Sequence, residues 1–345
     1  MTASDIVAGA RYEAVGQPSR SGRIAIVEAM RGLASIAVAC FHFSVLSSSP
    51  IGRFAHAYGW LGVDVFFVIS GFVIPLSLHG RDHSARDFPK FLMRRLARLE
   101  PPYLLSIALV LAAWQLSTLA PGFSGTPPTY SLPQIGFHFF YLIPLTHYEW
   151  LGPTYWSLAY EFVFYIVVGL TFASLASRPS LFTFGVVAAF GAVSLYAQHR
   201  FFPASLMVAR ILEFGVGVLL MRLVVDPPWA KVQSEAWLGL CLVAVFAFGN
   251  WAIGIAVLAT AAAIYFGKDL RLGRWAYVIG GFSYSLYLTH TIVGGRIENL
   301  GRRFGDGALY DTALLIVSLA VSIAFAMVFS RLFEAPFRRL SHRIA

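Results

Sequence analysis

Long apolar runs constrain this chain more than any other feature of its sequence. Five of them approach or exceed the roughly 20 residues that a helix needs to cross the hydrocarbon core of a bilayer; they are 24–46, 60–78, 103–119, 155–176 and 308–329. Only 12% of the residues are charged, whereas an ordinary soluble domain carries about 25%. The sequence therefore predicts an all-α integral membrane protein.

The apolar stretches predict about ten membrane-spanning helices, near 24–46, 58–78, 99–119, 153–176, 180–198, 204–224, 235–249, 251–267, 275–294 and 308–330. The apolar segment 135–145 is too short to span comfortably, and we interpret it as re-entrant. No soluble stretch is large enough for a separate active site. We expect one polytopic domain over 24–338, with a flexible cytoplasmic tail over 1–23 and a short cytoplasmic tail over 339–345.

The basic residues predict the topology. With 135–145 re-entrant and the N-terminus inside, 19 of the 26 Lys and Arg residues face the cytoplasm, 5 face outward, and Arg31 and Arg210 lie in the membrane. If the segment crossed, the two sides would hold 13 and 11. The positive-inside rule favours the first arrangement, with both termini cytoplasmic. It also accounts for the net charge of +9 without nucleic acid as a partner.

Ionisable residues inside the spans are candidate functional groups, because each costs about 2.5–3.5 kcal/mol to insert. Arg31 and His42 are eleven residues apart, which puts them on one face of the first span, about 16 Å apart along its axis. Arg31 could instead form an ion pair with Glu28, three residues earlier. His42 could instead be a hydrogen-bonded packing histidine.

Further polar residues gather in the outer half of the predicted membrane, a common depth that unrelated sites would not be expected to share. They are Asp64 in the second span, Trp156, Ser157 and Glu161 in the fourth, Arg210 and Glu213 in the sixth, and Tyr284 and His290 in the ninth. Asp64 could merely cap or pair structurally. Arg210 and Glu213, three residues apart, could be a structural ion pair.

A basic run lies before the third span and contains Lys90, Arg94, Arg95 and Arg98. It could be a topology signal or a contact with anionic lipid. It could also bind phosphate, because guanidinium groups grip phosphates in bidentate fashion. Cys40 and Cys241 lie in apolar segments, so we predict no metal site.

Taken in order, these residues resemble the type-three membrane acyltransferases of bacteria and animals, over nearly the whole chain from Ile24 to Arg338. The marks are Arg31 followed by His42, the segment 62–72, the basic run before Pro101, Trp156–Leu158 with Glu161, Arg210 with Glu213 and Phe214, 283–288 with His290, and Glu334 before Pro336. Met30 stands where Leu is usual.

The resemblance implies transfer of an acetyl or other short acyl group from cytoplasmic acyl-CoA to a hydroxyl of a carbohydrate or lipid-linked glycan. Exopolysaccharide, O-antigen and lipo-oligosaccharide are examples of such acceptors. It implies a multi-pass protein of the bacterial inner membrane, and a stand-alone member without the extracytoplasmic hydrolase-like domain that some relatives carry. A homo-oligomer is compatible with it.

On this interpretation Arg94, Arg95 and Arg98 hold the donor phosphates, and the pantetheine arm passes Arg31 toward His42. His42 acts as general base, oriented by Asp64 or Glu161, or forms an acyl-histidine. The expected acceptor site comprises Trp156, Ser157, Arg210, Glu213, Tyr284 and His290. The alternatives are a carrier that exports a small acid or glycolipid and an assembly partner with no chemistry of its own.

Overall fold

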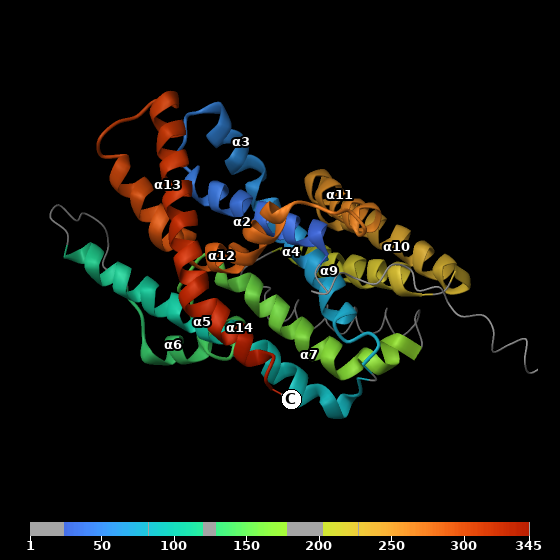
Figure 1. The fold of residues 1–345 in the computed structure, drawn as a ribbon. Helices are drawn as coiled ribbons and strands as arrows, with labels where there is room; N and C mark the ends of the chain where they lie inside the picture. Colours follow the sequence, from blue (N-terminus) through green and yellow to red (C-terminus); the bar gives the residue numbers. More distant parts are fainter. Residues whose placement is uncertain (1–23, 82, 120–128, 178–202, 227, 345) are drawn as a thin grey trace, which may run out of the picture.

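The computed structural model describes residues 24–81, 83–119, 129–177, 203–226 and 228–344, and over these ranges the chain is helical, with no strand (Figure 1). The helices are α2 (Ala25–Phe43), α3 (Pro50–Tyr58), α4 (Gly62–Leu76), α5 (Phe88–Thr118), α6 (Leu132–His138), α7 (Tyr155–Ser177), α9 (Ala204–Val225), α10 (Pro228–Phe248), α11 (Trp251–Gly267), α12 (Arg274–Gly301), α13 (Ala308–Phe329) and α14 (Ala335–Ser341). The predicted tail over 1–23 and the predicted span over 180–198 lie outside the described residues.

Six helical stretches in the described ranges are long and apolar enough to cross a bilayer: Ala25–Phe43, Pro50–Leu76, Ala85–Thr118, Tyr155–Ala173, Lys231–Phe248 and Ala308–Ser341. The helix α11 is apolar but shorter. The helices α9 and α12 have 22 and 28 residues and are not among these six. The prediction of an all-α integral membrane protein is confirmed, while the number of about ten spans stays a prediction.

The helices form two groups joined by α2 and α4. In one group α12 packs against α2 and α13, and in the other α9 packs against α4 and α10 (Figure 1). The contact between α4 and α9 is close because Gly71 lies against the Phe214 carbonyl and Gly217 lies against the Val68 carbonyl. A side chain at either glycine would collide with backbone, so these small residues set the helix spacing.

The helices α5 and α7 run antiparallel. Gly169, late in α7, lies against Phe88 at the start of α5, and Tyr155, at the start of α7, hydrogen-bonds Ser106 in α5 at 2.9 Å. The chain between them contains only the seven-residue α6 and the 3₁₀ turn Ile143–Leu145 as regular structure in its described part. This geometry supports a segment over 135–145 that makes no net crossing.

A π-helical turn, Ser330–Glu334, joins α13 to α14. Ala335 donates its N–H to the Ser330 carbonyl, five residues back, and Pro336, which has no N–H, cannot continue the hydrogen-bond ladder. Such turns often occur at functional sites. The turn directs α14 across α5 (Figure 1).

The antiparallel pair gives a topological prediction. Single cysteines introduced at Ser124 and Ser177 should react with a membrane-impermeant thiol reagent from opposite sides, because α7 separates them. A cysteine at Ser84, before α5, should label from the same side as Ser177. Labelling of Ser124 and Ser177 from one side would mean that 135–145 crosses the membrane.

Candidate active site

A cavity of about 420 Å³ lies among α2, α4, α5, α7, α12 and α14. Of the residues predicted for the site, six line it: Arg31, Arg95, Arg98, Ser157, Glu161 and Tyr284. Apolar side chains of α4, including Val63 and Phe66, form another part of the wall. The size and mixed lining are those of a small-molecule site.

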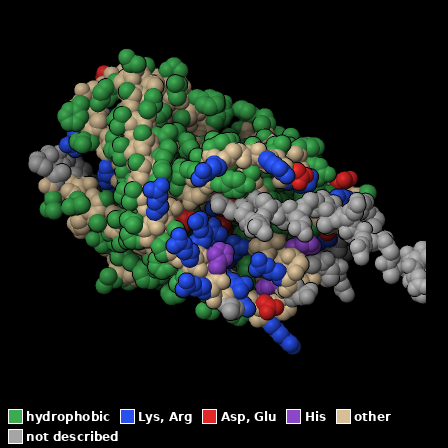
Figure 2. Space-filling model, viewed as in Figure 1, with side chains coloured by type: hydrophobic (Ala, Val, Ile, Leu, Met, Phe, Trp, Pro, Cys, Tyr) green, Lys and Arg blue, Asp and Glu red, His purple; other side chains and the backbone are tan. Residues whose placement is uncertain are grey.

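Three arginines make one end of the cavity cationic. Arg31 and Arg95 lie close enough to Arg98 for their like charges to interact, and Glu334 is the nearby carboxylate. Arg95 donates a hydrogen bond to Ser77 Oγ at 2.7 Å. Lys and Arg side chains gather where α14 and the start of α5 lie, on a surface that is otherwise largely apolar (Figure 2).

Arg31 and Glu28, which the sequence offered as an ion pair, both line the cavity. Arg31 therefore faces the cavity.

Arg94 does not share the position of its neighbours. Its Nε donates to the Ile344 carbonyl at 2.7 Å, and its side chain is not part of the cavity wall. Consecutive helical residues point about 100° apart. The basic run therefore places Arg95 and Arg98 at the cavity and Arg94 against the C-terminal segment. The structure thus separates Arg94 from Arg95 and Arg98, and the role of all three as donor ligands stays a prediction.

The predicted carboxylates lie in two separate places. Glu161 Oε1 accepts hydrogen bonds from Ser70 Oγ at 3.1 Å and from Tyr165 Oη at 2.6 Å. The Asp64 carboxyl group faces that of Glu213, with the Arg210 guanidinium beside them. Two carboxylates are acceptors only, so a hydrogen bond between them needs a shared proton.

Arg210 connects this second group to α7, because its guanidinium stacks on the Trp156 ring at 4.1 Å from the centroid. Asp64, Trp156, Arg210 and Glu213 thus form a cluster where α4, α7 and α9 meet. Neither Asp64 nor Glu161 is hydrogen-bonded to His42 among the described residues. The geometry does not join His42 to the carboxylate partner expected from the sequence.

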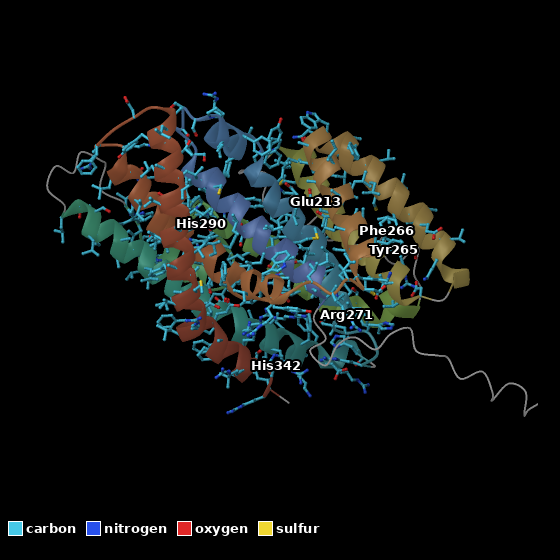
Figure 3. All side chains as sticks on the ribbon, turned by 45° about the horizontal axis from the view of Figure 1, so that its top comes forward. Glu213, Tyr265, Phe266, Arg271, His290 and His342 are labelled. Carbon is cyan, nitrogen blue, oxygen red and sulfur yellow. The ribbon has the colours of Figure 1, made fainter. Side chains whose placement is uncertain are left out.

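His42 lies beside His290, which is fully buried. The ring centroids are 5.1 Å apart, and Figure 3 shows His290 well inside the bundle. The Nδ1 of His290 donates to the Leu286 carbonyl at 2.9 Å, and its Nε2 has no hydrogen-bond partner in the described part of the chain. The two residues thus form a pair of imidazoles joining α2 to α12.

Tyr287 connects the cavity lining to this histidine pair. It lines the cavity, its hydroxyl is 2.6 Å from Ser157 Oγ and donates to the Thr154 carbonyl at 3.2 Å, and its ring centroid is 6.3 Å from that of His290. The cavity wall therefore includes a tyrosine whose ring neighbours His290.

A family profile described as an acyltransferase domain matches residues 24–327. The chain belongs to the type-three membrane acyltransferase family. Acyltransferase MdmB of Streptomyces mycarofaciens is 27% identical over 378 residues, covering 94% of each chain. BcsY of Komagataeibacter xylinus, named provisionally as a membrane-bound transacylase, is 27% identical over 289 residues, covering 76% of this chain and 71% of that protein. No solved structure matches the chain significantly.

The sequence prediction for this acyltransferase missed two residues of the site, Arg338 and His342, which line the cavity from the C-terminal segment. The first residues of the predicted tail over 339–345 belong to α14, which ends at Ser341. The overlooked signal is spacing, because Glu334, Arg338 and His342 lie four residues apart and share one helix face.

The wall made by Tyr287 can be tested through stability. Truncating a buried aromatic side chain costs about 3–5 kcal/mol, whereas removing the hydroxyl loses its contacts with Ser157 and Thr154, each worth about 0.5–1.5 kcal/mol. Tyr287→Ala should therefore lower the unfolding temperature in detergent clearly more than Tyr287→Phe. Equal unfolding temperatures for the two variants would mean that the ring does not fill this wall.

Proposed function

We propose that the protein is a transmembrane O-acyltransferase that moves an acetyl or other short acyl group from cytoplasmic acyl-CoA to a hydroxyl of a carbohydrate acceptor. One observation carries the proposal: Arg31, Arg95 and Arg98 are grouped in the lining of a single cavity that Tyr287 also lines, with His290 beside that tyrosine and His42 beside His290. An elongated donor with an anionic head and a reactive tail matches a cavity that has a cationic part and histidines close to another part of its wall.

The arginine end suits the phosphates of the donor. Guanidinium groups bind phosphate through charge-assisted hydrogen bonds, and Arg31, Arg95 and Arg98 converge on one interior space from two helices. A lipid-anchoring role would instead put the guanidinium groups on the outside of the bundle, at headgroup level. Because Arg95 and Arg98 line the cavity, we favour donor binding over lipid anchoring as their role.

In the proposed reaction, His42 accepts the proton of the acceptor hydroxyl as its oxygen attacks the thioester carbonyl. The carbon–sulfur bond breaks, the thiolate of CoA leaves, and the proton passes from His42 to that sulfur. His290, beside His42, is proposed as its positioning partner, in the role first assigned to Asp64 or Glu161. An acyl-histidine route uses the same residue and stays as the alternative mechanism.

The remaining assignments follow from position. Ser157 and Tyr284 line the cavity and are proposed to contact the transferred group or the acceptor. Asp64, Trp156, Arg210 and Glu213 are proposed to set the helix geometry around the site. A bacterial inner-membrane location, cytoplasmic termini and a surface-glycan acceptor such as exopolysaccharide, O-antigen or lipo-oligosaccharide complete the proposal.

The competing function is a carrier for a small acid or glycolipid, which would use the same intramembrane charges for transport. Release of CoA thiol from acetyl-CoA separates the two functions. An acyltransferase releases thiol in proportion to acceptor acylation, whereas a carrier releases none.

His42 is expected to be essential for transfer. His42→Ala should lower acylation about 10²–10⁴-fold, because general-base assistance is lost, while the protein still accumulates in the membrane. Mass spectrometry of the surface polysaccharide and a thiol-release assay would measure this. Near-normal acylation by this variant would make His290 the next candidate for the base.

Arg95 and Arg98 are expected to act on the donor alone. A hydrogen bond to a charged group contributes about 1.5–3 kcal/mol, so Arg95→Gln and Arg98→Gln should each raise the KM for acetyl-CoA roughly 10–100-fold. The KM for the acceptor should stay unchanged. Unchanged donor kinetics in both purified variants would return these residues to a topological role.

A further inference from the structure

The C-terminal helix α14 forms one wall of the cavity. Glu334, at the end of the π-helical turn, and then Arg338 and His342 all line it. Their four-residue spacing keeps them on one face of the helix. Arg339, next in sequence to Arg338, is exposed and not part of the lining. The helix thus turns Arg338 toward the cavity and Arg339 toward the outside, while His342 lines the cavity with an exposed side chain.

This wall is fastened on both sides of Arg338. At its start, Glu334 Oε2 accepts a hydrogen bond from Ser285 Oγ of α12 at 2.7 Å. At its end, Arg94 of α5 donates to the Ile344 carbonyl at 2.7 Å. Figure 3 shows His342 at the end of α14. The two contacts hold Arg338 and His342 at the same cavity that Arg95 and Arg98 line from α5.

Cations outnumber carboxylates around this cavity. Arg31, Arg95, Arg98 and Arg338 bring four guanidinium groups to it, against the carboxylates of Glu28, Glu161 and Glu334. Acyl-CoA carries a diphosphate and a separate 3′-phosphate. Two phosphate positions therefore match cations contributed from two sides, α5 and α14.

We propose that Arg338 and His342 bind a phosphate group of the acyl-CoA donor, and that Arg94 is the positioning residue that holds this C-terminal segment in place. The inference rests on the proposed donor. It assigns the end of the chain to the active site, and it gives Arg94 a task different from that of Arg95.

A phosphate can also come from an anionic lipid headgroup, so the test controls the lipid. Full-length protein is reconstituted in nanodiscs of phosphatidylcholine alone, and the Kd of CoA is measured by calorimetry. Arg338→Gln and His342→Ala should each weaken CoA binding, by roughly 10–100-fold for the arginine. The exposed neighbour provides the matched control, and Arg339→Gln should bind CoA as the unaltered protein does.

The positioning role of Arg94 has its own readout. Arg94→Gln should weaken CoA binding, and Arg94→Lys, which keeps a cationic donor for the Ile344 carbonyl, should restore most of it. Dephospho-CoA identifies the phosphate that is bound. If Arg338 holds the 3′-phosphate, Arg338→Gln and the unaltered protein should bind dephospho-CoA alike, whereas a diphosphate contact would keep the difference.

The outcomes distinguish this inference from the proposed function. An unaltered protein that binds no CoA would overturn both. Normal CoA affinity in folded Arg338→Gln and His342→Ala, with unfolding temperatures like that of Arg339→Gln, would overturn only the role of α14. If the substitutions in α14 changed the behaviour of the protein only in nanodiscs that contain phosphatidylglycerol, Arg338 and His342 would be lipid-binding residues. That result would also overturn the role of α14 in donor binding. Should Arg338→Gln fail to fold, Arg338→Lys and His342→Ala decide by the same measurement.

Discussion

The cost of placing charge inside a bilayer governs this structure. An ionisable side chain there must be paired or must face a polar cavity, and the chain uses both solutions. Asp64, Glu213 and Arg210 form a closed cluster where α4, α7 and α9 meet. Arg31 and Arg98 instead face an open cavity, which four arginines and the three carboxylates of Glu28, Glu161 and Glu334 line. Cations outnumber carboxylates around this open space, so it is the second arrangement that points to an anionic ligand.

Close helix packing makes that cavity. The glycine contacts between α4 and α9 bring backbones together without side chains between them, and the resulting bundle leaves its free space on the other side of α4, toward α2, α5 and α7. The π-helical turn then directs α14 across α5 to close the space. As a consequence of these backbone features, residues near both ends of the described chain, such as Arg31 and Arg338, line the same cavity.

The sequence predicted what depends on the local chain and missed what depends on packing. Apolar length identified the helices, and the helical period placed Arg31 and His42 on one face. Nothing local indicated that His42 would lie beside His290 rather than beside a carboxylate. Nor could it separate Arg94 from Arg95, since only the path of the C-terminal segment gives Arg94 its partner. The π-helical turn sets the direction of α14, and that direction determines the partner of Arg94.

The position of Tyr287 has a consequence for the proposed chemistry. Its hydroxyl contacts Ser157 Oγ at 2.6 Å and donates to the Thr154 carbonyl at 3.2 Å, and its ring is buried beside those of Phe66 and His290. Packing therefore holds the ring in place together with these hydrogen bonds, each of which contributes about 0.5–1.5 kcal/mol net. In the proposed reaction, the acceptor hydroxyl and the thioester would have to meet at this buried tyrosine, and a space from which bulk water is excluded would favour transfer to the acceptor over hydrolysis.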